Sequence, residues 1–311
     1  MQNTERGFPK RPLIHLLRGQ QAGALAANAF IRLKPQTIFP TLSESAHAVS
    51  LGRLGSLEAR LARDKRDVRR AQKLRYKVFY KNGSAIADAT TLLARRDKDA
   101  YDKVCDHLLV IDHDAPPTMS GKPRVVGTYR LLRQEIAERH HGFYTENEFD
   151  ISGLMERHPE LRFVELGRSC VLPDYRNKRT VELLWQGIWS YVRQHQLDVM
   201  IGCASLNGTD PDRLALPLSF LHHFAAAPAA WRAGAQHSRR VEMNRMAKQD
   251  IDPKAALREL PPLIKGYLRL GAHIGDGAVI DDQFGTTDVL IVLPVSAIKM
   301  RYIEHFSADA A

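Results

Sequence analysis

The feature that most constrains the fold is a strand–helix–strand pattern between residues 162 and 206. The segment RFVELGRSCVL (162–172) has the composition of a strand, and DVMIGCASL (198–206) is a continuous apolar run. Between them, residues 180–195 repeat apolar side chains at helical spacing, on a face made of Val181, Leu184, Trp185, Ile188, Trp189 and Val192. Such a unit predicts two parallel strands, joined by a crossover helix, in a sheet covered on both faces.

Further elements are predicted on both sides of this unit. Residues 107–112 and 124–133 have strand patterns and are separated by the turn-forming segment APPTMSGKP, so we expect a hairpin pair. Residues 286–295 predict a closing strand. The fold class predicted is α/β (α+β), with a mixed central sheet flanked by helices.

An additional helix is predicted over residues 67–80. Its apolar stripe includes one cation, Arg75, which shares a face with Phe79. A cation on the face of a helix that packs against the core needs a partner, because burying an unpaired charge is costly.

A change of composition near residue 60 predicts the domain organisation. Residues 1–60 mix Pro, Gly, Ser and Arg without a sustained period, so we expect a flexible basic N-terminal extension. Residues 61–311 are expected to form a single domain that starts near Leu57, with a mostly helical insertion at 211–270.

Charge and cysteine content limit the partners and the compartment. The chain has 45 Lys and Arg against 35 Asp and Glu, a net charge of +10, which favours an acidic protein, an anionic membrane surface or a nucleic acid as partner. Cys105, Cys170 and Cys203 show no CxxC spacing, so we expect reduced cysteines, no metal site and a cytoplasmic protein. No apolar run is long enough to span a bilayer, so any membrane contact would be peripheral.

The first predicted strand of the parallel pair contains two charges, Glu165 and Arg168, separated by Gly167. Residues three apart in a regular strand face opposite sides, but a bulge at the glycine would bring both side chains to one cleft. The alternative is a structural ion pair between Glu165 and Arg168 at a sheet edge.

Three cations, Arg176, Lys178 and Arg179, occupy the predicted helix start that follows this strand. Cations oppose the positive end of the helix dipole, so their position favours an anionic ligand such as a phosphate. A solvated basic turn is the alternative.

Five blocks of sequence occur in the order ELGRSCVLPDYR, LLWQGIWSYV, GCASL, LPPLIKGYLRLGA and GAVIDDQFGTTDVLIVLP. They resemble the L-ornithine Nα-acyltransferase family of bacterial ornithine-lipid synthesis, which belongs to the GNAT superfamily, and the resemblance runs from about residue 68 to residue 300. It implies a GNAT-like acyl-CoA N-acyltransferase fold. It also implies transfer of a 3-hydroxyacyl group from acyl carrier protein to the α-amine of L-ornithine, the first step of ornithine-lipid biosynthesis, which gives lyso-ornithine lipid.

The chain is more distantly similar to acyl-homoserine-lactone synthases. The matching positions are Arg75 and Phe79 on the first helix, Asp102 and Asp106, Arg130, and Glu165 with Arg168. The turn RNKRT lacks the glycines of the usual GNAT phosphate loop. The resemblance therefore implies no tightly bound cofactor and a donor phosphopantetheine arm, delivered by acyl carrier protein, that Arg176, Lys178 and Arg179 would meet.

The implied reaction is aminolysis of a thioester. A carboxylate that deprotonates the attacking amine would assist it, and Glu165 is the predicted base. Arg130 is predicted to bind the ornithine carboxylate, and Asp102 or Asp106 its δ-ammonium group. Asp106 could equally cap a turn, with Arg75 as its ion-pair partner.

Two other functions are compatible with part of the sequence. The first is an acyl-homoserine-lactone synthase, which the resemblance over most of the chain disfavours. The second is a basic binding module for a membrane or a nucleic acid, which would have no use for Glu165 within a strand. The chain shows no recognisable nucleic-acid-binding motif, so nucleic acid is not an expected partner.

Overall fold

The computed structural model describes residues 50–116, 121, 123–300 and 302, which belong to one compact unit. Residues 1–49 of the predicted flexible extension lie outside the described residues. Residues 50–60 were predicted to belong to that extension but form part of the sheet, so the predicted boundary at residue 60 is wrong.

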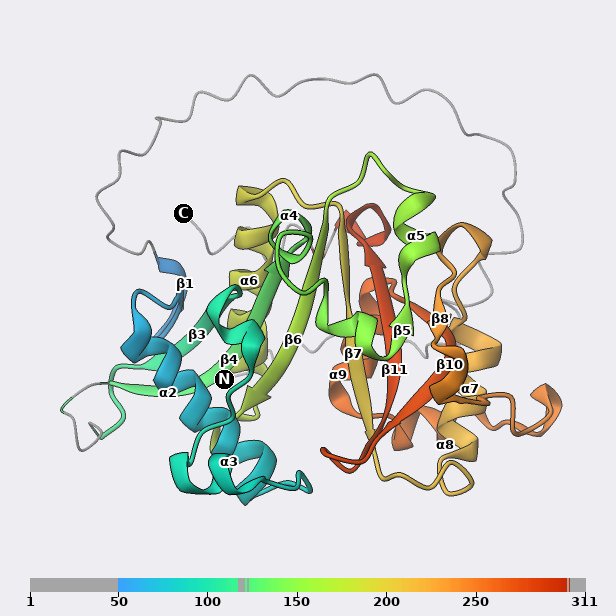
Figure 1. Cartoon of the computed structure of the whole chain (residues 1–311), viewed down its shortest axis with the longest axis horizontal. Helices are drawn as coiled ribbons and strands as arrows, with labels where there is room; N and C mark the ends of the chain where they lie inside the picture. The colour runs from blue at the N-terminus through green and yellow to red at the C-terminus, as the bar shows by residue number, and fades with distance from the viewer. Residues whose placement is uncertain (1–49, 117–120, 122, 301, 303–311) are drawn as a thin grey trace, which may run out of the picture. The chain divides into compact units, whose positions relative to one another are not determined.

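One mixed sheet of eleven strands organises these residues (Figure 1). Ten strands follow one another in space, in the order β1 (Ser50–Leu54), β2 (Leu57–Leu61), β3 (Asp106–Asp112), β4 (Arg124–Arg133), β6 (Phe163–Val171), β7 (Val199–Asn207), β11 (Thr286–Pro294), β10 (His273–Asp281), β8 (Gly234–Ala235) and β5 (Phe149–Asp150). The eleventh, β9 (Arg240–Val241), pairs with β10. The predicted hairpin of β3 and β4 is confirmed, because the two strands pair antiparallel.

The predicted strand–helix–strand unit is confirmed as β6, α6 (Lys178–Gln194) and β7. The two strands are parallel, but they pair only where residues 163–165 lie beside residues 199–201. Beyond Glu165 they diverge, as Figure 1 shows, while β6 keeps its pairing with β4 and β7 keeps its pairing with β11. This divergence opens the middle of the sheet.

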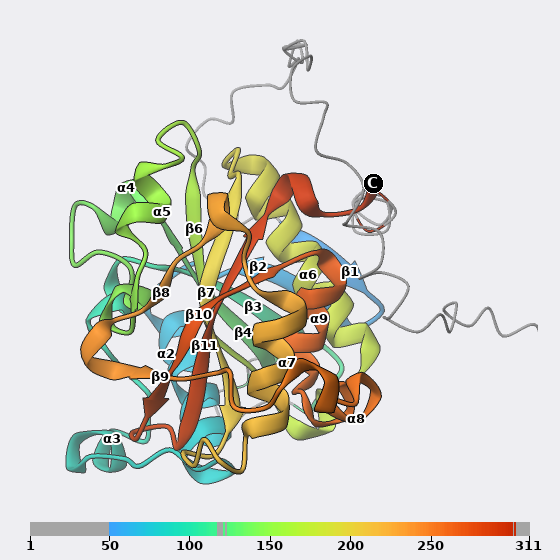
Figure 2. The ribbon, with the colours of Figure 1, turned by 90° about the vertical axis from the view of Figure 1, so that its right-hand side faces the viewer.

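Helices cover the sheet on both faces (Figure 2). On one face, α2 (Lys65–Arg75) packs against β4 and β6, and it continues into a π-helical turn, η2 (Tyr76–Lys81). On the other face lie α6, α7 (Ala215–Ala225), α8 (Pro253–Glu259) and α9 (Pro262–Leu270). Trp185 of α6 meets Tyr267 of α9 edge to face, so the two helices share one core.

Short elements complete the described chain. The α-helical ones are α3 (Ala89–Ala94), α4 (Gln134–Ala137) and α5 (Ser152–Glu156). The 3-10 turns are η3 (Ala100–Lys103), η4 (Tyr144–Asn147), η5 (Pro173–Tyr175), η6 (Ala229–Trp231), η7 (His237–Arg239), η8 (Lys248–Asp250) and η9 (Val295–Ala297).

Two sequence predictions differ from the structure. Val181 was predicted in the buried face of α6 but is 46% exposed, because it lies in the first helical turn, whereas the other five predicted residues are buried. The sheet begins at Ser50, so the predicted domain start near Leu57 falls at the second strand of the β1–β2 hairpin. Gly55, with a φ of +64°, makes the tight turn of that hairpin.

Candidate functional site

A bulge interrupts β6 where it leaves β7. Arg130 of β4 pairs with Gly167 and Thr128 pairs with Cys170, so β6 has one residue more than its partner. Arg168 has a φ of +50°, which places this non-glycine residue in the left-handed region. The bulge predicted from Gly167 is confirmed. Strained residues of this kind cluster at functional sites.

Glu165 is 4% exposed and anchors the start of η4. Its carboxylate accepts hydrogen bonds from the backbone N–H groups of Tyr144 (3.0 Å) and Thr145 (2.6 Å) and from the Thr145 hydroxyl (2.5 Å). Burial raises the pKa of Glu165, and these hydrogen bonds oppose that rise because they favour the charged carboxylate.

Arg168 also contacts Tyr144, the residue whose backbone N–H donates to Glu165. Its guanidinium lies over the ring of Tyr144, 4.7 Å from the centroid, and over that of Phe284, at 4.6 Å. It also lies 3.6 Å from a carboxylate oxygen of Asp97 and 3.5 Å from one of Asp99. Among the described residues no ion pair joins Glu165 to Arg168, so the alternative of a structural pair is wrong, and the two side chains contact opposite parts of Tyr144.

A buried network of charges holds α2 to the sheet beside Arg168. Arg75, 1% exposed, donates to Asp97 (2.7 Å) and to both oxygens of Asp102 (2.7 and 2.9 Å). Arg130 donates to both oxygens of Asp99, at 2.6 and 2.7 Å, and lies 3.6 Å from Asp102. The carboxylate of Asp102 and the guanidinium of Arg130 are therefore already used within the protein.

Asp106 lies elsewhere. Its carboxylate accepts a hydrogen bond from the hydroxyl of Tyr191 on α6 (2.7 Å) and lies 3.9 Å from Arg133. Arg75 pairs with Asp97 and Asp102, so the suggestion that Arg75 pairs with Asp106 is wrong. Asp102 and Asp106 are near each other in sequence but belong to separate clusters.

Phe79 lies in the π-helical turn η2 and meets Phe284 edge to face, with ring centroids 5.6 Å apart. Since Phe284 also lies under the Arg168 guanidinium, Phe79 belongs to the wall around Arg168. Isolated π-helical turns are frequent at functional sites.

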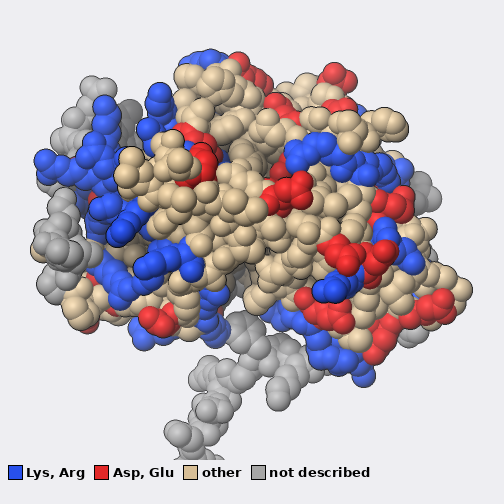
Figure 3. Space-filling view, turned by 60° about the horizontal axis from the view of Figure 1, so that its bottom comes forward, with Lys and Arg blue, Asp and Glu red and all other residues tan. Residues whose placement is uncertain are grey.

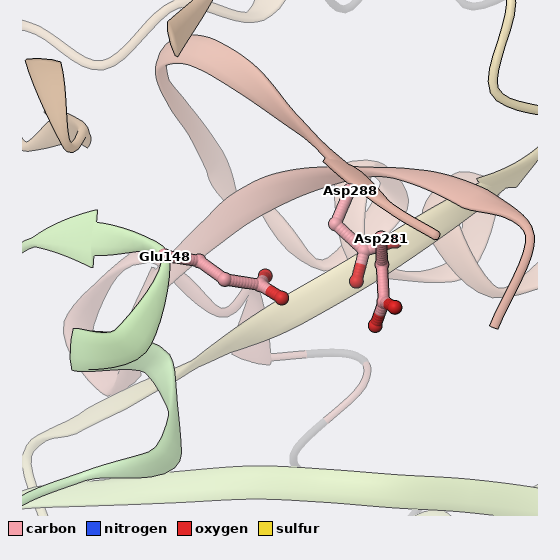
Figure 4. Close-up of side chains that lie close together, drawn as sticks. All are labelled: Glu148, Asp281 and Asp288. Carbon is pink, nitrogen blue, oxygen red and sulfur yellow. The ribbon is translucent and has the colours of Figure 1, made fainter. Parts of the chain in front are cut away.

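Three carboxylates that sequence reasoning missed meet on the β7 side of the divergence: Glu148, Asp281 and Asp288 (Figure 4). One oxygen from each lies within 4.8 Å of the others, and Glu148 Oε2 is buried without a hydrogen-bond partner among the described residues. Burial first, and then the neighbouring Asp288, raises the pKa of Glu148 to about 7. Asp288 could have been noticed, because it is a carboxylate in the otherwise apolar run TTDVLIVLP.

Cys203 of β7 connects this cluster to Glu165. Its Sγ lies 3.8 Å from Thr145 Oγ1, and its thiol also interacts with Glu148. Burial, followed by the charges of Glu148 and Asp288, raises the pKa of Cys203 well above its ordinary value, so the thiol is a poor nucleophile. Glu165, Thr145, Cys203 and Glu148 thus form one continuous site.

Comparison with known proteins identifies the family. The L-ornithine N(alpha)-acyltransferase of Agrobacterium fabrum is 53% identical over 259 residues, which cover 83% of this chain and 88% of that protein. The chain belongs to this family. The enzyme of the same name from Brucella abortus is 50% identical over 268 residues, 86% of this chain and 95% of its own.

The Acetyltransferase (GNAT) domain family matches residues 74–186 of this family member, from α2 to the middle of α6. The predicted GNAT-like fold is thereby confirmed. Among solved structures, FeeM, an N-acyl amino acid synthase from uncultured soil microbes, aligns with 77% of this chain and 91% of its own, at 7% identity and a TM-score of 0.42.

In this family member the basic turn RNKR lies at the surface. Arg176, Lys178 and Arg179 are exposed, and the Asn177 side chain caps α6 by accepting from the Thr180 N–H (3.1 Å). Arg179 reaches back to the carbonyl of Leu54 in the β1–β2 turn (3.4 Å). Within the described ranges, every helix is too short or too polar to cross a bilayer.

A stability measurement can test the environment of Glu148. Its pKa is raised from 4.5 to about 7, so the folded protein holds this proton more tightly than the unfolded chain does. Stability should therefore fall as pH rises from about 4.5 to 7. We expect Glu148→Gln to raise the free energy of unfolding by up to about 3 kcal/mol at pH 8 and to change it little at pH 4.5.

Urea denaturation at the two pH values measures this difference. Asp282→Asn is the matched control, because Asp282 is an exposed carboxylate next to the cluster. A Glu148→Gln variant less stable than the parent at pH 8 would contradict this account of the cluster.

Proposed function

We propose that the chain transfers a 3-hydroxyacyl group from acyl carrier protein to the α-amine of L-ornithine and so forms lyso-ornithine lipid. The observation that carries the proposal is 53% identity over 83% of the chain to an enzyme named for ornithine Nα-acylation. The site described above offers groups suited to this chemistry, with carboxylates on one side of the diverging strands and a guanidinium on the other.

In the proposed reaction the neutral α-amine attacks the thioester carbonyl, the oxygen becomes an oxyanion, and the thiolate of the donor arm leaves after the tetrahedral intermediate collapses. Glu165 takes the proton of the amine, directly or through a water molecule, since a neutral amine is the minority form at pH 7. The interrupted ladder at Gly167 and Arg168 supplies a place where a backbone N–H can face the oxyanion.

The carboxylate of ornithine is assigned to Arg168 in this proposal, in place of Arg130. Arg130 Nη1 donates to both oxygens of Asp99 at 2.6 and 2.7 Å. Arg168 lies farther from Asp97 and Asp99, at 3.6 and 3.5 Å, and its Nε is without a hydrogen-bond partner among the described residues. The Arg168 side chain is also more accessible, at 13% exposure. Arg75 and Phe79 then act by shaping the wall that holds Arg168.

The donor is proposed to be a carrier-protein thioester, with no tightly bound cofactor. Acyl carrier proteins are acidic, and Figure 3 shows Lys and Arg side chains gathered at its left, the side where α2 lies in Figure 1. The exposed basic residues of α2 include Lys65, Arg66, Arg69 and Lys73. Because the product is a lipid, we further propose a cytoplasmic location with peripheral contact to an anionic membrane surface.

Charge removal at the start of α6 should weaken the donor interaction. We expect the double variant Arg176→Ala, Arg179→Ala to raise the apparent constant for acyl carrier protein more than about tenfold, since two charge-assisted contacts are lost and solvent screens both. Its constant for ornithine should not change, and the effect should shrink as salt rises.

The matched control is Lys254→Ala with Arg258→Ala, which removes two exposed charges from α8 instead. Equal effects of the two double variants would mean that net charge alone matters and that the RNKR turn does not meet the donor.

Lipid mass spectrometry of a bacterial host that expresses the chain tests the proposed function. We expect a new species with ornithine joined by an amide bond to a 3-hydroxy fatty acid. A new product whose head group is a homoserine lactone, or no new amide at all, would contradict it.

A further inference from the structure

The reaction steps proposed so far assign no individual role to the carboxylates of Glu148, Asp281 and Asp288. Glu148 directly follows η4, Asp281 ends β10, and Asp288 lies in β11, which pairs with the edge of β7 that faces away from β6. Figure 4 shows the three side chains directed toward one another from separate elements. Carboxylates brought together from three elements, one of them only 3% exposed, are costly unless a cation neutralises them.

No protein cation within the described ranges does so. The positive charge of Arg239 lowers the pKa of Glu148, and that of Arg168 lowers the pKa of Asp288, but burial outweighs both. Arg239 uses its guanidinium on the backbone carbonyls of Asn147 and Ile280, and Arg168 pairs with Asp97 and Asp99. Arg239 thereby fixes the two residues that precede Glu148 and Asp281, while the carboxylates themselves stay without an ion-pair partner.

The carboxylate oxygens of the cluster are only partly satisfied by hydrogen-bond donors. Asp281 Oδ1 accepts from the Phe284 N–H (3.0 Å), and Asp288 Oδ1 accepts from the Thr286 hydroxyl (2.9 Å). The Asp288 carboxylate also interacts with the Ser205 side chain, and the Glu148 carboxylate with the Cys203 thiol. Glu148 Oε2 is the buried atom with no donor. The cluster therefore has unused acceptor capacity at its centre.

The spacing of these oxygens suits an ammonium group. An ammonium has three N–H donors on a carbon stem, and acceptors about 2.8 Å from its nitrogen in tetrahedral directions lie about 4.6 Å apart. The three carboxylates each offer an oxygen within 4.8 Å of the others. The separations of these oxygens are therefore compatible with one ammonium that contacts all three.

We propose that the Glu148–Asp281–Asp288 cluster binds the side-chain ammonium of the amino-acid acceptor and selects for acceptors that carry one. The inference rests on the proposed function, in which that acceptor is ornithine. Cys203 and Thr145 connect the cluster to Glu165, so an acceptor with its terminal ammonium in the cluster can present its α-amine toward the predicted base. Arg168, across the divergence, repels the ammonium and attracts the carboxylate, which sets the orientation.

A pair of acceptors tests this assignment. L-norvaline has the carbon skeleton of ornithine without the δ-amine, and rates are measured for both with 3-hydroxyacyl carrier protein at saturation. We expect the parent protein to favour ornithine over norvaline in kcat/KM by about tenfold or more. Glu148→Gln and Asp288→Asn should bring that ratio toward one, because each variant raises KM for ornithine more than KM for norvaline.

Calorimetric titration of ornithine into each protein gives the same comparison without turnover. Asp282→Asn, which alters the exposed neighbouring carboxylate, should retain the parent ratio and affinity. If the parent acylates ornithine but both cluster variants keep its ratio, or lose both acceptors equally, the assignment is overturned and the proposed function stands.

Two further results would separate a failure of the ammonium site from a failure of the proposed function. Loss of activity on treatment with a chelator, restored by Mg²⁺ or Ca²⁺, would overturn the assignment in favour of a metal site. A parent protein that acylates no acceptor would instead refute the proposed function. The calorimetric comparison would then decide the ammonium site alone: equal ornithine affinity in parent and cluster variants overturns it, and weaker affinity in the variants supports it.

Discussion

Replacement of Arg75 by methionine is expected to lower the free energy of unfolding by about 3–5 kcal/mol. The side chain keeps its approximate volume, but Asp97 and Asp102 lose the buried cation that lies closest to them, at 2.7 Å, and keep only Arg168 and Arg130 at 3.6 Å. Denaturant unfolding measures the loss. Arg69→Met, at an exposed position of the same helix, is the control and should change stability by less than about 0.5 kcal/mol.

The same network predicts that Asp102→Asn behaves as a folding defect. We expect it to destabilise the protein and to weaken both substrates together, since Asp102 accepts from Arg75 and from the Gln72 amide. A stable Arg75→Met variant with a selective loss of ornithine binding would show that this network contacts the acceptor directly.

The second large effect concerns Glu165. We expect Glu165→Gln to lower turnover roughly a hundredfold or more, the range for loss of a general base. The variant also places an amide N–H₂ group opposite the N–H donors of Tyr144 and Thr145, so some loss of stability accompanies it.

Thr145→Val distinguishes a general base at Glu165 from a residue that only anchors η4. It removes the hydroxyl that donates a hydrogen bond to the Glu165 carboxylate. Because that hydrogen bond favours the charged carboxylate, its loss raises the pKa of Glu165 further. If Glu165 is the base, the acidic limb of the kcat/KM profile moves to higher pH in Thr145→Val and disappears in Glu165→Gln. Unchanged limbs in both variants would leave Glu165 as the anchor of η4 and nothing more.

Periodicity was sufficient for the elements that pack locally. The apolar stripe of α6, the runs of β6 and β7, and the glycine that interrupts β6 each depend on neighbours in sequence. These predictions are confirmed except at Val181, which is exposed. β10 was missed because His273–Asp281 contains polar residues and two glycines that obscure the strand pattern. Gly275 is required there, since a Cβ atom would approach Leu290 to 2.8 Å.

The spacing of charged residues in the sequence did not reveal which of them pair with one another in the fold. Asp102 and Asp106 are close in the sequence, yet Asp102 accepts a hydrogen bond from Arg75 on α2 and Asp106 accepts one from Tyr191 on α6. The acid cluster joins residues up to 140 positions apart through β-sheet pairing and through the carbonyls that Arg239 holds, and no local pattern announces it. Asp97 and Asp99, which hold Arg75 and Arg130, were likewise hidden in a polar stretch.

The most direct test is a reaction of the purified protein with 3-hydroxyacyl carrier protein and L-ornithine, with the product examined by tandem mass spectrometry. The site predicts a single amide at the α-nitrogen, because the δ-ammonium is held among Glu148, Asp281 and Asp288 while the α-amine faces Glu165. Fragments that retain a free δ-amine would support this arrangement. An amide at the δ-nitrogen, or thioester hydrolysis without amide formation, would contradict it.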